Sequence, residues 1–136
     1  MTKYLSAYGI ALVLFLILDA LWLGVIARNF YASRMGDLLL DQPRWGVAAV
    51  FYAVYIVGLV YFGVAAGMAA GAWQAAALNG ALFGFFAYLT YNFTNLSVLR
   101  GYDGIVAMVD TGWGTFMGAV VAGGTVAILQ WLGQID

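Results

Sequence analysis

The distribution of apolar residues along the chain predicts four membrane-spanning helices. Apolar stretches cover residues 4–27, 47–69, 73–93 and 105–132, and each is long enough to cross a bilayer, which takes about 20 mainly apolar residues. A very short turn around residues 67–72 joins the second stretch to the third, so these two helices are expected to be antiparallel neighbours. The predicted fold is therefore all-α: a single domain over residues 1–136, a polytopic membrane protein with four transmembrane helices in an antiparallel bundle.

The placement of the basic residues orients this bundle. Arg28, Arg34 and Arg44 lie between the first and second stretches and Arg100 lies between the third and fourth, whereas only Lys3 lies on the other side. Short loops rich in Lys and Arg stay in the cytoplasm. Both termini are therefore expected outside, in the periplasm, for a multi-pass protein of the bacterial inner membrane. The first stretch lacks a clear small-residue cleavage site, so it is expected to be a retained span rather than a signal peptide.

The segment between the first two stretches, residues 28–45, carries a pattern of its own. Aromatic and aliphatic residues alternate with Arg34, Asp37 and Asp41 before Pro43 ends the pattern. A short interfacial helix on the cytoplasmic surface suits this alternation, because such a helix buries an apolar face and keeps its charges toward water. An ordered polar loop with a few aromatic anchors suits it equally well.

Polar and aromatic side chains gather in the cytoplasmic half of the predicted bundle. Each helix contributes them near its cytoplasmic end although neighbouring helices run in opposite directions, which a random scatter would not produce. On the third helix they recur at helical spacing and so share one face. Together they predict a polar, aromatic-lined cup whose candidate ligand-binding or proton-responsive residues are Asp19, Trp22, Tyr52, Tyr55, Tyr88, Tyr91, Asn92, Asn95, Asp110 and Trp113.

Asp19 and Asp110 are the two acidic members of this cup, and each precedes a tryptophan by three residues. A carboxylate in hydrocarbon costs roughly 2.5–3.5 kcal/mol on insertion scales, so something must compensate for it. Two carboxylates in one low-dielectric cup do not both ionise easily. At least one is therefore expected to hold a proton near neutral pH, which suits proton exchange or general acid–base work.

Structural roles compete with this interpretation. Asp110 followed by Thr111 also fits the N-cap of a fourth helix that otherwise begins near Ile105. Asp19 also fits a packing residue. The groups available to hold or neutralise one of the acids are Asn92, Asn95, the tyrosine hydroxyls, Arg28 and Arg100.

Glycines at four-residue spacing occupy the opposite, periplasmic half. Small residues at this spacing let helix backbones approach closely, so helix packing is the main interpretation. Part of the packing is expected at an oligomer contact, because the glycine faces exceed what one bundle needs. The spaced glycines are Gly63, Gly67 and Gly71; Gly80 and Gly84; and Gly114 and Gly118.

The composition removes several function classes. With 65% hydrophobic and 8% charged residues, the chain is no soluble domain, since roughly a quarter of an ordinary domain is charged. The five basic and six acidic residues nearly balance, which excludes an electrostatic nucleic-acid binder. The lack of cysteine and histidine excludes disulfides, thiolate chemistry and most zinc sites. No catalytic residue, metal site or cofactor is assigned.

A set of motifs spread over almost the whole chain carries a family resemblance. The motifs are Asp19-x-x-Trp22-Leu23, Asn29-Phe30-Tyr31, Phe51-Tyr52-x-x-Tyr55-x-x-Gly58, Gly80-x-x-x-Gly84, Tyr88-x-x-Tyr91-Asn92-x-Thr94-Asn95-Leu96 and Asp110-x-x-Trp113-Gly114. Together they resemble DUF2177, a family of small bacterial four-span membrane proteins of unknown function. In that family an acid usually stands where this chain has Asn92, and a tryptophan is usual near Tyr102. This chain departs from the pattern at both places, and Asn92 argues against a mechanism that needs a third carboxylate in the cup. Members look as though they often accompany genes for lipid modification, which implies a modest preference for a lipid-related role.

Three functions follow, in order of preference. The first is an integral membrane protein that binds or moves a small amphipathic molecule or lipid through the cup, with Asp19 as the group that would make this proton-linked. The second is an accessory subunit of a larger membrane complex or lipid-modifying system. The third, a lipid-modifying enzyme using Asp19 and Asp110, ranks lowest because no nucleophile, metal site or cofactor motif accompanies the acids. Expected partners are membrane lipids and a second copy or another membrane protein, and no nucleic acid.

Overall fold

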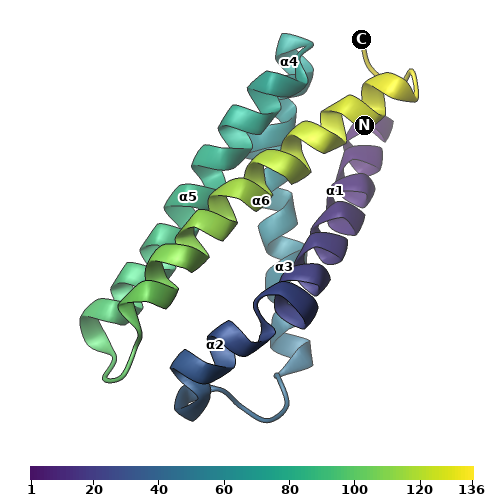
Figure 1. The fold of residues 1–136 in the computed structure, drawn as a ribbon. Helices are drawn as coiled ribbons and strands as arrows, with labels where there is room; N and C mark the ends of the chain where they lie inside the picture. The colour runs from purple at the N-terminus through teal and green to yellow at the C-terminus, as the bar shows by residue number, and fades with distance from the viewer.

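The apolar stretches become helices in the computed structural model, which describes residues 1–136 and contains no strand (Figure 1). The first forms α1 (Thr2–Leu21), extended by a π-helical turn, η1 (Trp22–Ile26). Next come α2 (Arg28–Met35) and a 3₁₀ turn, η2 (Gly36–Leu38). The all-helical prediction is confirmed, and the segment between the first two stretches contains a short helix rather than only a loop.

A second long helix runs without interruption from Trp45 to Ala70. It consists of α3 (Trp45–Leu59), a π-helical turn η3 (Val60–Val64) and α4 (Ala65–Ala70). It ends because Gly71 adopts a left-handed conformation, with φ at 64°. Glycine reaches this conformation without the steric cost that a Cβ brings.

The last two helices are α5 (Trp73–Val98) and α6 (Gly104–Trp131). Asp103 caps α6, since its side chain accepts a hydrogen bond from the Val106 backbone N–H at 2.8 Å. The interpretation of Asp110 as the cap is therefore wrong. Asp103 has the extended backbone (φ −86°, ψ 126°) that an N-cap adopts, whereas Asp110 lies well inside the helix.

Three helices are long and apolar enough to cross a membrane: Thr2–Ile26, Trp45–Ala70 and Gly104–Trp131. With 26 residues, α5 measures about 39 Å at 1.5 Å per residue, so its length also suffices. It continues to Val98, beyond the predicted end at residue 93. Asparagine, threonine and tyrosine side chains make it less apolar than the other three helices.

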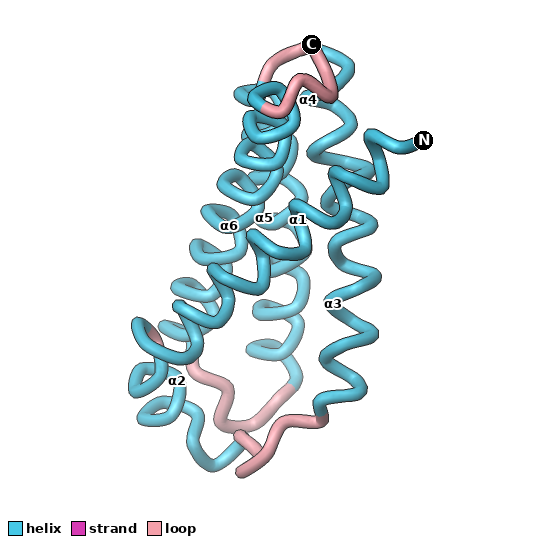
Figure 2. The backbone as a smooth tube through the Cα atoms, turned by 90° about the vertical axis from the view of Figure 1, so that its right-hand side faces the viewer, coloured by secondary structure: helices cyan, strands magenta, loops and turns pink.

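The pair α5 and α6 is the tightest in the molecule, and these helices lie side by side in both views (Figures 1 and 2). A Cβ on Gly80 would collide with the Gly118 carbonyl, and one on Gly84 would collide with the Gly114 carbonyl. The predicted packing role of these four glycines is confirmed. Gly71 differs, because it forms the turn after α4 and a Cβ there would meet nothing within 4 Å.

The remaining long helices complete the core. The buried residues of α1 are Ala7, Ala11 and Phe15, and α1 packs mainly against α6. The second long helix packs against α5, most closely at Gly67, where a Cβ would approach the Ala76 backbone nitrogen to 2.9 Å. Small residues therefore hold the helices together toward the end of the molecule that carries both termini.

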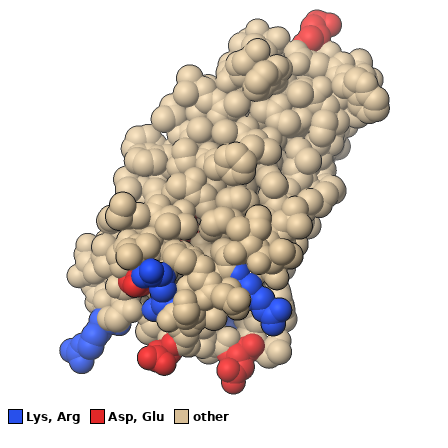
Figure 3. All heavy atoms as spheres, in the orientation of Figure 1, with Lys and Arg blue, Asp and Glu red and all other residues tan.

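On the face of the molecule drawn in Figure 3, the charged side chains lie toward the two ends. Both termini lie at one end and α2 lies at the other (Figure 1). On the face drawn in Figure 3, the Lys and Arg side chains gather at the α2 end, and the middle of the molecule carries no charge. An ion pair of 3.5 Å between Arg34 Nη1 and Asp103 Oδ2 ties α2 to the turn before α6.

Candidate functional site

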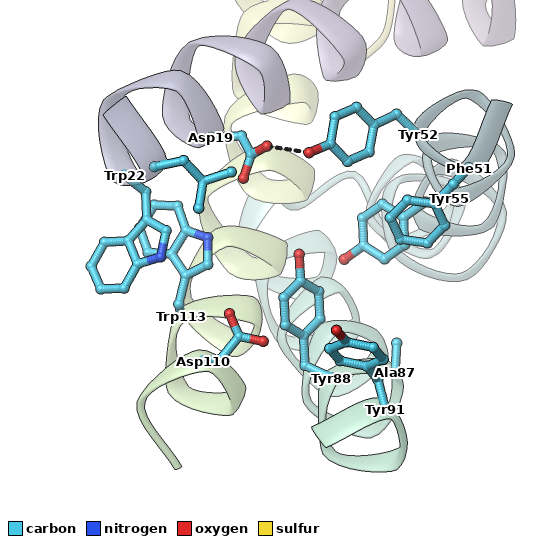
Figure 4. Close-up of a pocket in the computed structure, with 11 residues that line it drawn as sticks. Asp19, Trp22, Phe51, Tyr52, Tyr55, Ala87, Tyr88, Tyr91, Asp110 and Trp113 are labelled. Carbon is cyan, nitrogen blue, oxygen red and sulfur yellow. Dashed lines mark hydrogen bonds between the residues drawn. The ribbon is translucent and has the colours of Figure 1, made fainter. Parts of the chain in front are cut away.

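A cavity of about 520 Å³ lies between the long helices toward the α2 end (Figure 4). Its wall combines apolar surface and aromatic rings with two carboxyl groups. Mainly apolar cavities of this size with a few converging polar groups are typical of small-molecule sites. The lining residues are Asp19, Trp22, Leu23, Phe51, Tyr52, Tyr55, Ala87, Tyr88, Tyr91, Asp110 and Trp113.

Side-chain size explains why the cavity forms at this end. Toward the termini the second long helix and α5 touch through glycines, and a Cβ on Gly63 would lie 3.1 Å from the Gly80 Cα. Toward α2 the contact is made by rings. Tyr55 packs on Phe83 and Tyr88, with ring centroids 5.4 and 6.3 Å apart. Because the distance between packed helices depends on the side chains at their contact, rings hold these two apart and leave space between them.

Asp19, near the end of α1, is half-buried in this wall. Tyr52 Oη on α3 donates a hydrogen bond to Asp19 Oδ2 at 2.7 Å (Figure 4). The other carboxyl oxygen, Oδ1, makes no hydrogen bond within the protein. A tyrosine hydroxyl therefore holds Asp19, as one of the structural interpretations predicted. The free oxygen can still accept a hydrogen bond from a molecule in the cavity or lie beside a positive charge.

Asp110 is held more completely than Asp19. Tyr31 Oη on α2 donates to its Oδ1 at 2.6 Å, and Asn92 Nδ2 on α5 donates to its Oδ2 at 2.7 Å. The network continues on both sides, because Trp22 Nε1 donates to Tyr31 Oη at 3.0 Å and Tyr102 Oη donates to Asn92 Oδ1 at 2.6 Å. Both oxygens of Asp110 are occupied, and the network joins η1, α2, α5 and α6.

The tryptophans that follow the two acids meet face to face. Trp22 and Trp113 stack with ring centroids 4.4 Å apart and an interplanar angle of 5°. Residues three apart on a helix share one face, so each acid points to the same side as its tryptophan. The two Asp-x-x-Trp segments therefore face each other between α1 and α6, and the stacked rings form one wall of the cavity (Figure 4).

Two polar groups in the wall have no partner. Tyr55 Oη and Trp113 Nε1 are buried and make no hydrogen bond, and the Tyr55 side chain is only 8% exposed. An unpaired buried donor costs about 1–3 kcal/mol, and native proteins pair nearly all such groups. Both residues line the cavity, but the two donor atoms themselves expose almost no surface, so an acceptor atom of a bound molecule would pair with them only after a small movement of the rings.

No basic side chain lines the cavity. The interpretation in which Arg28 or Arg100 neutralises an acid is wrong, because neither forms an ion pair with Asp19 or Asp110. Both arginines are exposed, and an exposed guanidinium keeps its hydration. The cavity thus holds two carboxyl groups and no cation.

The structure brings most of the predicted cup residues into one place. Of the ten, eight line the cavity, whereas Asn92 is fully buried behind it as a donor to Asp110, and Asn95 does not line it. Asn92 lies between the cavity and the turn before α6, since it donates to Asp110 and accepts a hydrogen bond from Tyr102. Whether the eight bind a ligand stays a prediction.

Three lining residues were missed in the sequence: Leu23, Phe51 and Ala87. Helical spacing was the available signal for two of them. Phe51 lies four residues before Tyr55 and Ala87 lies four residues before Tyr91, so each shares a face with a predicted residue. The sequence interpretation selected polar and amphipathic side chains and passed over purely apolar ones.

Tyr31 and Tyr102 were missed as well, because they lie outside the predicted spans. Burial, followed by the hydrogen bond to Asp110 and the charge of that carboxyl group, raises the pKa of Tyr31 above its usual range. Burial raises the pKa of Tyr102 to about 12. Both hydroxyls therefore stay protonated and able to donate at neutral pH. Tyr31 and Asp110 are 79 positions apart in the chain, so no local pattern connects them.

The groups that line the cavity offer several kinds of noncovalent contact. No group of three or more acidic, histidine or cysteine side chains comes together to hold a metal ion. Aromatic rings offer apolar contact, Asp19 offers an acceptor or a negative charge, and Tyr55 and Trp113 offer donors.

Comparison with known proteins agrees with the family resemblance of the motifs. A family model described as "Predicted membrane protein (DUF2177)" matches residues 4–127, which is nearly the whole chain. No curated protein and no solved structure matches the chain.

Proposed function

The chain belongs to the DUF2177 family of predicted membrane proteins, and from this premise we propose that it binds or moves a small amphipathic molecule or lipid through the cavity. Two buried donors without partners, Tyr55 Oη and Trp113 Nε1, carry this conclusion. An amphipathic guest suits both parts of the wall. Its apolar portion would contact the rings, and an acceptor atom would pair with the donors.

In this proposal the protein lies in a membrane, and α5 is the fourth crossing helix of an antiparallel bundle. Its buried residues include Gly80, Gly84 and Asn92, so this face meets protein rather than lipid, as polar groups in a bilayer require. The basic residues at the α2 end would then lie in the cytoplasm and both termini in the periplasm of a bacterial inner membrane. Membrane lipids and a second copy of the chain are the partners this setting offers.

Access to the cavity would come sideways from the lipid. Phe51 on α3 and Tyr91 on α5 are 55% and 59% exposed and stand at the edge of the cavity. In a bilayer these rings would contact lipid of the cytoplasmic leaflet. Toward the other leaflet the glycine contacts between Gly63 and Gly80 close the bundle, so a guest would enter and leave between α3 and α5.

Asp19 is the group that would link guest binding to protons. The titratable groups around it are Tyr31 on α2, Tyr52 on α3, Tyr88 on α5 and Asp110 on α6, and no basic group lines the cavity. A proton and a guest that carries a donor or a positive charge would compete for the free Oδ1 oxygen. Binding of one would therefore release the other.

Native mass spectrometry of the protein, extracted gently from its own membranes, tests the proposal. The wild-type chain is expected to retain a small molecule or lipid. The Asp19→Asn variant is expected to lose it, because the amide keeps the shape of the carboxyl group but not its charge. The matched control is Asp41→Asn, which changes an exposed carboxyl group in the loop before α3 and should retain the molecule.

The other outcomes of this experiment are distinct. A bare wild-type chain, or a bound molecule that Asp19→Asn retains as the control does, would contradict the proposal. A second polypeptide in place of a small molecule would identify an accessory subunit instead. The same spectra count the copies of the chain in the particle.

A further inference from the structure

Resting on the proposed binding function, we infer that the guest of the cavity is a cationic amphiphile: an apolar chain whose head carries an amine next to an oxygen acceptor. The inference concerns the chemical class of the guest. Three features of the wall carry it independently: its charge, its rings and its unpaired donors.

The charge of the wall selects the sign of the head. Asp19 and Asp110 both line the cavity, and no Lys or Arg does. A phosphate, sulfate or carboxylate head would lie beside two acids without any basic group to neutralise it, which is unfavourable in a medium of low dielectric constant. An ammonium group has the opposite preference, because the free Oδ1 of Asp19 can pair with it.

The rings of the wall favour the same sign. Trp22 and Trp113 stack on one side, and Tyr52, Tyr55 and Tyr88 stand on the other (Figure 4). Faces of tryptophan and tyrosine rings attract cations, and the attraction is stronger where water is excluded. Protein groups satisfy both oxygens of Asp110, so Asp19 and the rings are left to receive the amine.

The unpaired donors require more than an amine. Tyr55 Oη and Trp113 Nε1 need an acceptor, and an ammonium group has none. A hydroxyl or carbonyl oxygen beside the amine would serve both needs. A simple alkylammonium ion would leave these two donors unpaired.

The test uses the purified protein in uncharged maltoside micelles with four probes that share a 12-carbon chain. These are 2-amino-1-dodecanol, dodecylamine, 1-dodecanol and dodecyl phosphate. Dissociation constants are measured from the fluorescence of the tryptophans, two of which line the cavity. The amino alcohol is expected to bind at least about tenfold more tightly than dodecanol, since hydrogen bonds to charged groups contribute about 1.5–3 kcal/mol. Dodecyl phosphate is expected to show no saturable binding.

Two variants separate the amine from the oxygen. Asp19→Asn should weaken both amines about tenfold or more and leave dodecanol unchanged, which also shows that the variant is folded. Tyr55→Phe should weaken the amino alcohol about two- to tenfold, the range of one neutral hydrogen bond, and leave dodecylamine unchanged. The matched controls are Asp41→Asn and Tyr61→Phe, whose side chains are exposed outside the cavity.

Failure of the inference and failure of the proposed function give different results. Equal affinity for dodecanol and the amino alcohol, or tighter binding of dodecyl phosphate, overturns the cationic class and leaves the binding function standing. Equal affinity of the amino alcohol and dodecylamine overturns the need for an oxygen. No saturable binding of any probe overturns the inference, and the binding function falls with it only where the native mass spectra also contradict that function.

Discussion

Asp19 keeps one carboxyl oxygen free, whereas both oxygens of Asp110 accept hydrogen bonds, from Tyr31 and Asn92. The same local motif, an acid three residues before a tryptophan, therefore stands in two environments. A satisfied buried network stabilises a fold, and an unsatisfied group is free to bind. We therefore interpret Asp110 as the residue that holds the α2 end together and Asp19 as the residue available to a guest.

The structural role of Asp110 can be tested through its donor Tyr31. The Tyr31→Phe variant removes the hydroxyl that bridges Trp22 and Asp110 and leaves the ring. We expect it to lower the free energy of unfolding by about 1–3 kcal/mol, the range for leaving a buried partner unpaired. The measurement is unfolding by dodecyl sulfate in mixed micelles. Tyr61→Phe is the control, since its side chain is 72% exposed, and it should unfold like the wild type.

The same pair of proteins should differ in pH dependence. Burial and the contact with Asp110 raise the pKa of Tyr31 in the folded state, whereas an unfolded tyrosine titrates near pH 10. The contribution of Tyr31 is therefore fully present below about pH 10 and is lost as the pH rises toward the higher folded value. The difference in stability between wild type and Tyr31→Phe should be constant up to about pH 9 and shrink above pH 10. A difference that stays constant to pH 11 would contradict the buried hydroxyl.

At the scale of elements, the turn after α1 explains how Tyr31 reaches Asp110. The backbone N–H of Ala27 donates to the Trp22 carbonyl at 2.7 Å, which closes a π-helical turn. Such turns insert a residue into a helix and occur often at functional sites. Here the turn begins at Trp22 and leads into α2, whose Tyr31 hydroxyl accepts a hydrogen bond from Trp22 and donates one to Asp110. A pattern of apolar residues carries no signal for a π-turn, and none was predicted.

The half of the bundle toward the termini is held together by glycine contacts, and it depends on the close approach of α5 and α6. A Cβ at Gly84 would collide with the backbone of Gly114, which cannot move aside as a flexible side chain can. We expect Gly84→Ala to lower the free energy of unfolding by more than about 2 kcal/mol, since overpacking in a tight core costs about 1–3 kcal/mol or more. The measurement is again unfolding in mixed micelles.

Gly112 provides the matched control within α6. A Cβ there meets nothing within 4 Å, and alanine is the better helix former by about 1 kcal/mol. Gly112→Ala should therefore be neutral or slightly stabilising. If Gly84→Ala and Gly112→Ala destabilised the protein equally, the close approach of the helices at Gly84 would not explain the loss of stability.

At the scale of the whole molecule, the sequence predicted the helices and the half of the bundle in which the polar groups meet. Helical spacing was sufficient for this, because it fixes which residues of one helix share a face. It could not predict the stacking of Trp22 on Trp113 or the bridge from Tyr31 to Asp110, because each joins segments about 80–90 positions apart. It also left the start of α6 open between Ile105 and a cap at Asp110, because Asp103 and Asp110 are chemically equal capping residues and only the backbone conformation separates them.

The chain contains no cysteine, so single cysteines can determine how many helices cross the membrane. We propose Thr2→Cys, Ser33→Cys, Leu99→Cys and Gln134→Cys, all at exposed positions in or next to the ends of helices. A charged maleimide that does not cross the inner membrane should label the cysteines at positions 2 and 134 in cells whose outer membrane has been opened. It should label those at positions 33 and 99 only after lysis.

This pattern separates four crossings from three because α5 decides the side of everything after it. If α5 stays outside the membrane, residue 99 remains on the periplasmic side and α6 carries the C-terminus into the cytoplasm. Leu99→Cys would then be labelled before lysis and Gln134→Cys only after it. Reversal of all four results would keep four crossings and overturn the orientation drawn from the arginines. With four crossings and the expected orientation, the network around Asp110 lies toward the cytoplasmic side, and the exposed rings of Phe51 and Tyr91 place the way into the cavity on the lipid side, between α3 and α5.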